Sequence, residues 1–168
     1  RQRQMCIRDS YRAEERGMIR GHQFNKVEMV QYTTEDQSDA AFEELVGKAE
    51  RLVQELGLHY RLSKLAAGDC SFSMARTYDI EVWIPSMGIY KEVSSASNAR
   101  DYQARRGNVK YRGADKKLHL AHTLNASGLA TSRVIPAIVE QYQNDDGSVT
   151  VPEVLRPYLG IDRIEKQR

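Results

Sequence analysis

Two strand-like runs separated by only four residues constrain the fold most. TYDIEVWI covers residues 77–84, IYKEVSS covers residues 89–95, and PSMG lies between them. In the first run Tyr78, Ile80, Val82 and Ile84 alternate with Thr77, Asp79, Glu81 and Trp83, which is typical of a strand with one buried face. Because the link contains Pro and Gly, the pair predicts a β-hairpin. Asp79 and Glu81 share the acidic face of its first strand, which we expect to face solvent or a polar cleft.

A second segment, GMIRGHQFNKVEM at residues 17–29, combines apolar and charged residues. As an extended strand it would place Ile19, Val27 and Met29 on one side. The other side would carry Arg20, His22, Phe24, Lys26 and Glu28. The first side is suited to a core and the second to a binding site. Residues 11–14 precede it across the short connection EERG, and we expect them to form the other strand of a hairpin.

Two helices are predicted between the strand-like segments. Apolar residues recur at helical spacing over residues 38–56, where Asp36 or Ser38 could be the N-cap and Gly57 would stop the helix. A second helix is expected at residues 127–143, and further strands at 58–66 and 119–124. Strands and helices do not alternate regularly, so we predict an α+β fold, a mainly antiparallel sheet flanked by helices.

The composition favours one domain in a reducing, cytoplasmic setting. The chain has 168 residues, of which 40% are hydrophobic, enough for a single core. Cys6 and Cys70 are far apart and show neither a disulfide framework nor zinc-ligand spacing. No run is long enough for a membrane helix, so no membrane partner is expected. We expect residues 1–10 to be a non-native or disordered tail and residues 161–168 a C-terminal tail.

Residues 100–117 form a basic segment. They contain seven Arg or Lys residues, only two Asp residues, and the interleaved Tyr102 and Tyr111. Such a segment can contact phosphates and stack on bases. A solvated basic loop has the same composition, so the segment is not assigned a chemical role.

Three groups of residues suggest a nucleotide site. YRAE followed by RGMIRGHQFNKVE brings arginines, an aromatic ring and carboxylates to neighbouring strands, and arginine binds phosphate through two aligned donors. KEVSSASN supplies oxygen-bearing side chains of the kind that hold magnesium together with substrate phosphates. In LNASGLATSR, Asn125 and Ser127 precede a predicted helix N-terminus and Arg133 lies inside it, an arrangement that favours anions. No glycine-rich Rossmann or P-loop motif is present.

These motifs, in this order, resemble the catalytic domain of bacterial seryl-tRNA synthetases, which are class II aminoacyl-tRNA synthetases. The motifs are YRAE, RGHQFNKVE, TYDIEVWIP, EVSSASN, QARR, HTLNASGLA and VPEVLRPY. The resemblance runs from about Tyr11 to about Gly160, so it implies a partial class II catalytic domain over residues 11–160. It also implies formation of seryl-adenylate from ATP and serine, transfer of the seryl group to tRNA(Ser), and a homodimer for the full-length protein.

The resemblance implies roles for individual residues in the ATP site. That site would comprise Arg12, Ala13, Glu14, Arg20, Phe24, Glu92, Val93, Ser94, Ser95 and Arg133. Arg12 and Arg133 would be the catalytic residues, the first at the α-phosphate and the second at the terminal phosphate. Phe24 would stack on adenine, and Glu92 and Ser95 would hold Mg2+.

The serine site implied by the resemblance comprises Arg12, Glu28, Asn125 and Ser127. Arg12 would bind the carboxylate of serine as well as the phosphate, and Glu28 would pair with the ammonium group. Ser127, with Asn125 near it, would read the hydroxyl group. A site built to hydrogen-bond a hydroxyl group rejects the analogue that lacks it, so alanine is expected to be a poor substrate.

The sequence departs from the family pattern at the connection after Glu14. Only Glu15 separates RAE from the following RG, where family members usually have a longer loop that approaches the tRNA acceptor end. Two alternative functions therefore stand beside tRNA charging. One is a non-catalytic nucleotide-binding homologue, and the other is a synthetase-like ligase that charges a carrier protein.

Overall fold

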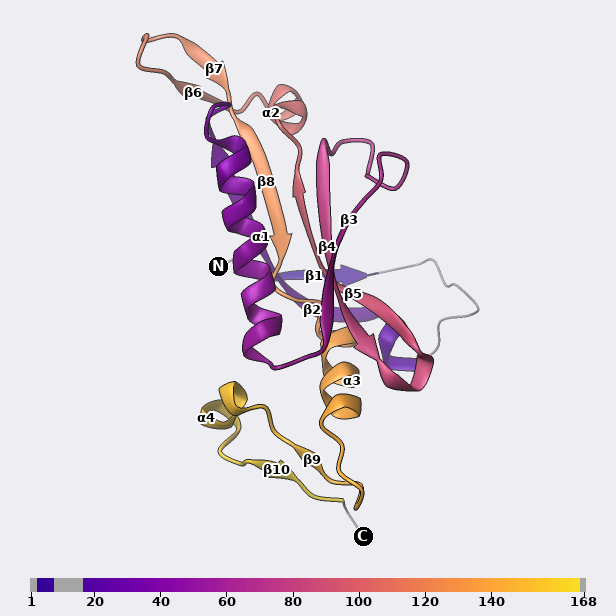
Figure 1. Cartoon of the computed structure of the whole chain (residues 1–168). Coiled ribbons are helices and arrows are strands. Elements are labelled where there is room, and N and C mark those ends of the chain that lie inside the picture. Colours follow the sequence, from indigo (N-terminus) through magenta and orange to yellow (C-terminus); the bar gives the residue numbers. More distant parts are fainter. Residues whose placement is uncertain (1–2, 8–16, 167–168) are drawn as a thin grey trace.

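The computed structural model describes residues 3–7 and 17–166, and within them a six-stranded sheet organises the chain (Figure 1). The strands, in sheet order, are β1 (Arg3–Ile7), β2 (Gln23–Thr33), β8 (His122–Ser127), β5 (Ile89–Asn98), β4 (Arg76–Ile84) and β3 (Tyr60–Lys64). All neighbouring pairs in this sheet are antiparallel. The predicted α+β class with a mainly antiparallel sheet is confirmed.

Strand β1 lies in the segment that was predicted to be a non-native or disordered tail. Arg3–Ile7 pairs antiparallel with β2, from Arg3 opposite Val27 to Ile7 opposite Gln23. The structure describes these five residues as a strand, and the assignment of residues 1–10 as a non-native or disordered tail stays a prediction. The hairpin partner predicted at residues 11–14 lies outside the described residues.

The hairpin of β4 and β5 forms as predicted, with a short 3-10 turn, η2 (Pro85–Met87), and Gly88 at φ 62°. Its register shifts in the middle: Ile80 lies opposite Ser94, but Glu81 lies opposite Glu92. Val93 is thus an extra residue, a β-bulge. Because the bulge resets the alternation, Glu92 and Ser95 face the same side of the sheet although they are three residues apart.

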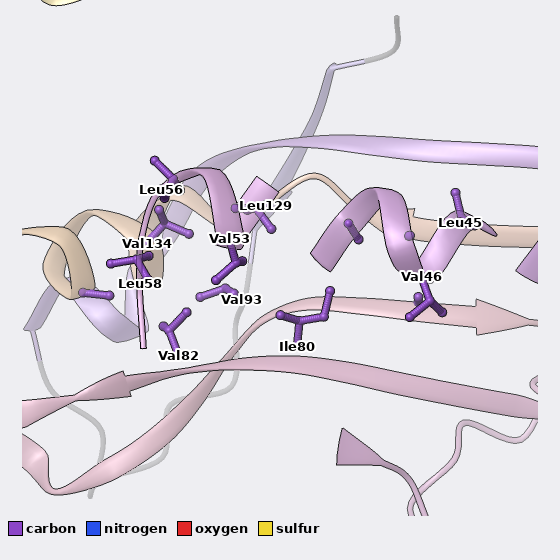
Figure 2. Packing of buried hydrophobic residues seen from close by; sticks show 14 of the residues in the cluster. Leu45, Val46, Val53, Leu56, Leu58, Ile80, Val82, Val93, Leu129 and Val134 are labelled. Carbon is purple, nitrogen blue, oxygen red and sulfur yellow. The ribbon is translucent and has the colours of Figure 1, made fainter. Parts of the chain in front are cut away.

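Helix α1 (Ser38–Glu55) covers one face of this sheet and supplies about a third of the buried residues of the core (Figure 2). Phe42 and Val53 are fully buried, as are Ile80 and Val82 of β4. The predicted helix is confirmed, and Gly57 follows it at φ 66°. The predicted side-chain cap is wrong, because the N-cap position is Gln37 and no side chain caps the helix there.

Helix α3 (Thr131–Gln141) starts four residues later than predicted. Ser127 ends strand β8 instead of capping the helix, because its backbone pairs with Glu28 of β2. Arg133 consequently lies in the first turn of α3. The 3-10 helix η1 (Gly17–Arg20) packs against α3, so Arg20 precedes strand β2 and does not belong to it.

The basic segment folds into helix α2 (Tyr102–Gly107) and strand β6 (Lys110–Arg112), which pairs with β7 (Leu118–Leu120). This hairpin lies beside the start of α1 (Figure 1). At the opposite end of the molecule are β9 (Val149–Thr150), η3 (Glu153–Leu155), α4 (Arg156–Leu159) and β10 (Arg163–Ile164).

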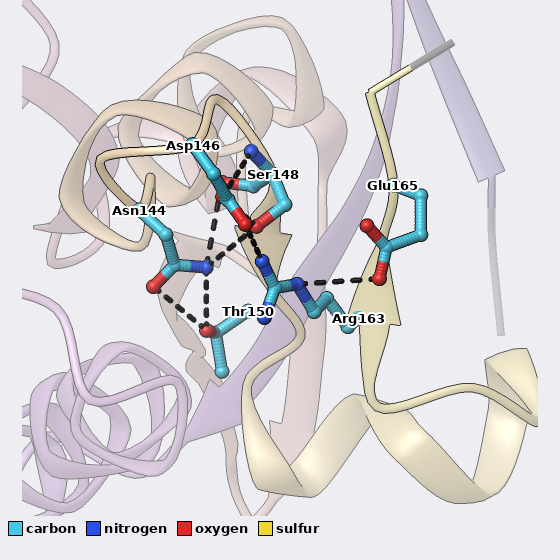
Figure 3. Close-up of polar contacts among 6 residues, drawn as sticks. All are labelled: Asn144, Asp146, Ser148, Thr150, Arg163 and Glu165. Atoms are coloured by element: carbon cyan, nitrogen blue, oxygen red, sulfur yellow. Dashed lines mark hydrogen bonds and ion pairs between the residues drawn. The ribbon is translucent and has the colours of Figure 1, made fainter.

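Strand β10, which belongs to this last group of elements, lies within the predicted C-terminal tail. Strand β10 pairs antiparallel with β9, and Arg163 forms ion pairs with Asp146 and Glu165 (Figure 3). Asp146 also accepts hydrogen bonds from the backbone N–H and the hydroxyl of Ser148. The assignment of residues 161–168 as a C-terminal tail stays a prediction. No helix in the described part of the chain is long and apolar enough to cross a membrane.

Replacing Phe42 with alanine tests whether the interface between α1 and the sheet is the core. Because the ring is fully buried, Phe42→Ala should lower the free energy of unfolding by about 3–5 kcal/mol. Urea denaturation followed by circular dichroism measures this loss. Phe72→Ala is the matched control, because Phe72 is 90% exposed and should change stability by less than about 1 kcal/mol. Equal losses in the two variants would contradict this placement of the core.

Candidate functional site

The face of the sheet opposite α1 carries the polar side chains. In β8, Leu124 and Ala126 belong to the core, so the alternating Asn125 and Ser127 point to the other face. The pairing of β2 with β8 sets Glu28 opposite Ser127. Three of the four residues predicted for the serine site, from two segments about 100 residues apart, therefore meet on one face.

Glu28 is the centre of this cluster. Its Oε1 accepts a hydrogen bond from Asn125 Nδ2 at 2.8 Å, and its Oε2 accepts one from Ser127 Oγ at 3.1 Å. Lys26 Nζ lies 2.9 Å from Glu28 Oε2 and donates to Ser127 Oγ at 2.9 Å. A half-buried carboxylate held in this way can bind an ammonium group, and the neighbouring hydroxyl and amide can recognise a small polar group.

Lys26 was missed as a site residue, although it was placed on the polar face of its strand. The signal that could have found it is the two-residue spacing to Glu28, which puts both side chains on the same side of β2. Phe24 precedes Lys26 by two residues and is half-buried on that face. Phe24, Lys26 and Glu28 therefore follow one another along the strand, as the alternation predicts.

A second group of polar residues surrounds the bulge in β5. Arg133, from the first turn of α3, is buried and donates through Nη1 to the backbone oxygen of Glu92 at 2.7 Å. The same nitrogen lies 3.6 Å from Glu92 Oε2. Sequence reasoning named both residues, and the structure brings them together because α3 packs against β5.

Asp79 belongs to this group and was not named as a site residue. It lies opposite Ser95 in the pairing of β4 with β5. Burial raises the pKa of Asp79 to about 6; a hydrogen bond from Ser95 opposes this rise, and the charges of Glu92 and Glu81 add to it. Its Oδ1 is buried and has no hydrogen-bond partner within the described ranges. The acidic pattern of the strand was visible in the sequence, but its position beside the bulge was not.

These residues fit a divalent cation that also binds phosphate. Glu92 and Ser95 share a face with the orphaned Oδ1 of Asp79, and carboxylate and hydroxyl oxygens are the ligands that Mg2+ prefers. Within residues 17–166 no three His, Cys, Asp or Glu side chains gather to hold an ion by themselves. A magnesium ion at this place would therefore need phosphate oxygens among its ligands.

Two predicted ATP-site residues have side chains inside the fold. Val93 and Ser94 are fully buried, because the bulge turns both away from the polar face. Ser94 Oγ donates to the backbone oxygen of Ser127 at 2.6 Å, and the backbone oxygen of Val93 accepts from Ala130 N at 2.7 Å. They link β5 to the end of β8 and to the start of α3.

Three predicted site residues, Arg12, Ala13 and Glu14, lie outside the described residues, as does most of the short connection that follows them. Arg20 lies at the end of η1, which packs against α3. The described part of the predicted site therefore comes from η1, β2, β5, β8 and α3.

Comparison with known proteins identifies the class to which this fold and site belong. The tRNA synthetase class II core domain (G, H, P, S and T) matches residues 2–142, so the chain belongs to this family.

Within the family the similarity is to serine-specific enzymes. The chain is 72% identical over 156 residues to serine--tRNA ligase 2 of Clostridium acetobutylicum, covering 92% of this chain and 37% of that protein. It is 57% identical over 155 residues to the serine--tRNA ligase of Thermosipho melanesiensis, covering 92% and 36%. The chain thus spans little more than a third of the length of these relatives.

Solved structures agree with the sequence comparison. Seryl-tRNA synthetase from Pyrococcus horikoshii complexed with ATP superposes with a TM-score of 0.93 at 40% identity, over 99% of this chain and 38% of that one. Cytoplasmic serine-tRNA ligase from Naegleria fowleri in complex with AMP gives a TM-score of 0.89 at 36% identity, over 99% and 40%. The predicted resemblance to seryl-tRNA synthetases is confirmed.

The raised pKa of Asp79 predicts a dependence of stability on pH. Because the folded state favours the protonated carboxyl group, stability should fall as the pH rises from about 4 through about 6. Asp79→Asn should therefore stabilise the chain at pH 7.5 by about 1 kcal/mol, after allowance for the solvent that reaches this half-buried group. The gain should vanish near pH 4.

Thermal melting of both proteins across this pH range measures the effect. The matched control is Asp69→Asn, at an exposed aspartate, which should leave the pH profile of the melting temperature unchanged. A gain for Asp79→Asn of the same size at pH 4 and pH 7.5 would show that the ionised carboxylate is not the cause.

Proposed function

We propose that the protein to which this chain belongs activates serine with ATP and transfers the seryl group to tRNA(Ser), with residues 11–160 forming part of its catalytic domain. The observation that carries the proposal is the cluster of Glu28, Asn125 and Ser127, since it offers one group for an ammonium and two for a hydroxyl. The similarity to serine--tRNA ligases supports the same substrate. Cytoplasmic location and a homodimer are part of this proposal.

In the proposed first step a serine carboxylate oxygen attacks the α-phosphorus of ATP. A new oxygen–phosphorus bond forms, the bond from this phosphorus to the bridging oxygen breaks, and pyrophosphate leaves. Since the carboxylate is already ionised at neutral pH, no general base is needed. A hydroxyl of the terminal tRNA ribose then takes the seryl group and AMP leaves. Catalysis rests on positioning and charge stabilisation.

The predicted serine-site residues and Arg133 each have a proposed role in this scheme. Glu28 binds the ammonium group of serine. This ammonium group takes the place of Lys26, with which Glu28 is paired in the structure. Ser127 and Asn125 bind the hydroxyl. Arg133 is held against β5 by the backbone oxygen of Glu92, and in this scheme its guanidinium binds the terminal phosphate.

The remaining proposed contacts are with ATP. Phe24 stacks on adenine and Arg20 binds phosphate. Glu92 and Ser95 hold Mg2+, which neutralises phosphate charge when it is bound. By the same proposal Arg12 and Glu14 bind the α-phosphate and the adenine amino group.

Replacing Arg133 tests the ATP half of the proposal. Arg133→Ala in the full-length parent protein should lower serine-dependent exchange of pyrophosphate into ATP by at least about 100-fold, because a buried donor for the terminal phosphate is removed. Arg51→Ala is the control: Arg51 is an exposed residue of α1, paired only with Glu55 in the described chain, and its removal should leave exchange near the wild-type rate. Near-normal exchange in Arg133→Ala would overturn the assignment.

Replacing Ser127 tests the substrate. Ser127→Ala should reduce the preference for serine over alanine, measured as the ratio of kcat/KM values in ATP consumption, by about 100-fold, because the group that reads the hydroxyl is removed. The control is Ser71→Ala, at an exposed position, which should keep the wild-type ratio. An unchanged ratio in Ser127→Ala would place hydroxyl recognition elsewhere.

The short connection after Glu14 favours a second candidate, a nucleotide-binding homologue that does not charge tRNA. Only Glu15 separates the two motifs, so a long loop toward the tRNA is missing from the sequence. Calorimetry that detects ATP binding, together with no serine-stimulated pyrophosphate exchange, would support this candidate. The third candidate is a synthetase-like ligase that charges a carrier protein. Charging assays with tRNA and with a carrier protein distinguish these two acceptors.

A further inference from the structure

The basic segment lies outside the proposed serine and ATP site. His122 starts strand β8 and Ser127 ends it, so five residues of extended chain, about 17 Å, separate the two ends. At the His122 end, the hairpin of β6 and β7 projects beside the start of α1 (Figure 1). Any ligand of this hairpin would bind apart from the serine cluster.

One face of the hairpin and its tip carry cations that no carboxylate neutralises. Lys110, Lys116 and Lys117 are exposed, and in the described chain none of them forms an ion pair. The acid of the tip, Asp115, is instead engaged with His119. Three lysines on a short hairpin are suited to consecutive phosphates of a flexible strand.

The other face of the hairpin forms a wall of a polar pocket of about 640 Å3. Tyr111 and His119 are cross-strand partners whose rings stack with centroids 5.6 Å apart. The charged residues that also line the pocket are Glu35, Asp39, Arg100, Asp101 and Arg105, of which Arg105 is paired with Asp101. His122, 8% exposed, also lines the pocket, and its Nδ1 is buried with no hydrogen-bond partner among residues 17–166.

The distribution of charge decides what such a pocket can accept. With Asp101 and Arg105 paired, Glu35 and Asp39 outnumber Arg100, so the pocket keeps a net negative charge that disfavours a phosphate or another anion inside it. The carboxylates of Glu35 and Asp39 accept hydrogen bonds from the amino and imino groups of a neutral base. The paired rings of Tyr111 and His119 offer an aromatic surface to the same base. The lysines of the hairpin then bind the phosphates on either side of that base.

We propose that this hairpin and pocket bind an unpaired stretch of RNA, with one base in the pocket and the flanking phosphates at Lys110, Lys116 and Lys117. The choice of RNA over DNA rests on the proposed function, in which the parent protein handles tRNA. The binding surface is additional to the serine and ATP site.

Fluorescence anisotropy with a labelled single-stranded RNA of about 12 nucleotides tests the proposal on the whole chain. For single strands, the slope of log K against log salt becomes shallower by about 0.7 for each phosphate that the protein no longer neutralises. The double variant Lys116→Gln, Lys117→Gln should therefore bind with a slope shallower by about 1.4. The control, Lys48→Gln with Lys166→Gln, removes the same charge from other elements and should keep the wild-type slope.

A third variant tests the base-binding wall. Tyr111→Ala should weaken binding by about 5- to 100-fold with the salt slope unchanged, because stacking carries no net charge. His119→Leu provides a second test, since it removes the other ring of the wall but keeps an apolar side chain on the strand. Circular dichroism confirms that both variants fold.

Three outcomes would overturn the proposal: no binding at about 50 mM salt, equal effects of the two lysine pairs, or tight binding of a fully paired RNA that Tyr111→Ala leaves unchanged. ATP binding, followed by calorimetry on the same samples, separates this proposal from the function above. If the chain binds ATP but not RNA, the RNA-binding proposal is wrong and the proposed function is unaffected. The expected RNA behaviour without ATP binding would support the hairpin and contradict the nucleotide site.

Discussion

The register between β2 and β8 is the constraint on which the rest of the site depends. These strands are remote in sequence, yet Glu28 lies opposite Ser127. The register is fixed from the other face, where Leu124 and Ala126 are buried in the core beneath α1. A slip by one residue would expose those apolar side chains and turn Asn125 and Ser127 inward. The same alternation that builds the core therefore aims the polar cluster.

The bulge at Val93 has a comparable effect on the neighbouring strands. It brings Glu92 to the same side as Ser95, Asp79 and Glu81. Carboxylates gathered in this way repel one another, and part of this repulsion appears in the raised pKa of Asp79. Two cations oppose this charge: Arg61 pairs with Glu81, and Arg133 lies close to Glu92. A site that is strained by like charges before it meets a ligand is suited to bind a cation together with phosphate.

Local signals predicted the regular elements well and their boundaries less well. The hairpin around PSMG and helix α1 followed from alternation, helical spacing and Gly57, all of which act within a few residues. The start of α3 was predicted four residues early, because pairing with β2 holds Ser127 in a strand against its preference for a helix cap. The pairing of Arg3–Ile7 escaped prediction because this segment has no apolar period and its partner β2 lies about 20 residues away.

The sequence by itself determined the fold class, the family resemblance and which residue types could bind a nucleotide and serine, because motifs and alternation are properties of neighbouring residues. Only the tertiary structure decided which of them meet. It joined Lys26 to Ser127, and it placed Asp79 beside the bulge. It also turned Val93 inward and set a stacked pair of rings over a polar pocket. These outcomes depend on strand register and helix packing, which are set by the burial of the whole core and not by any short segment.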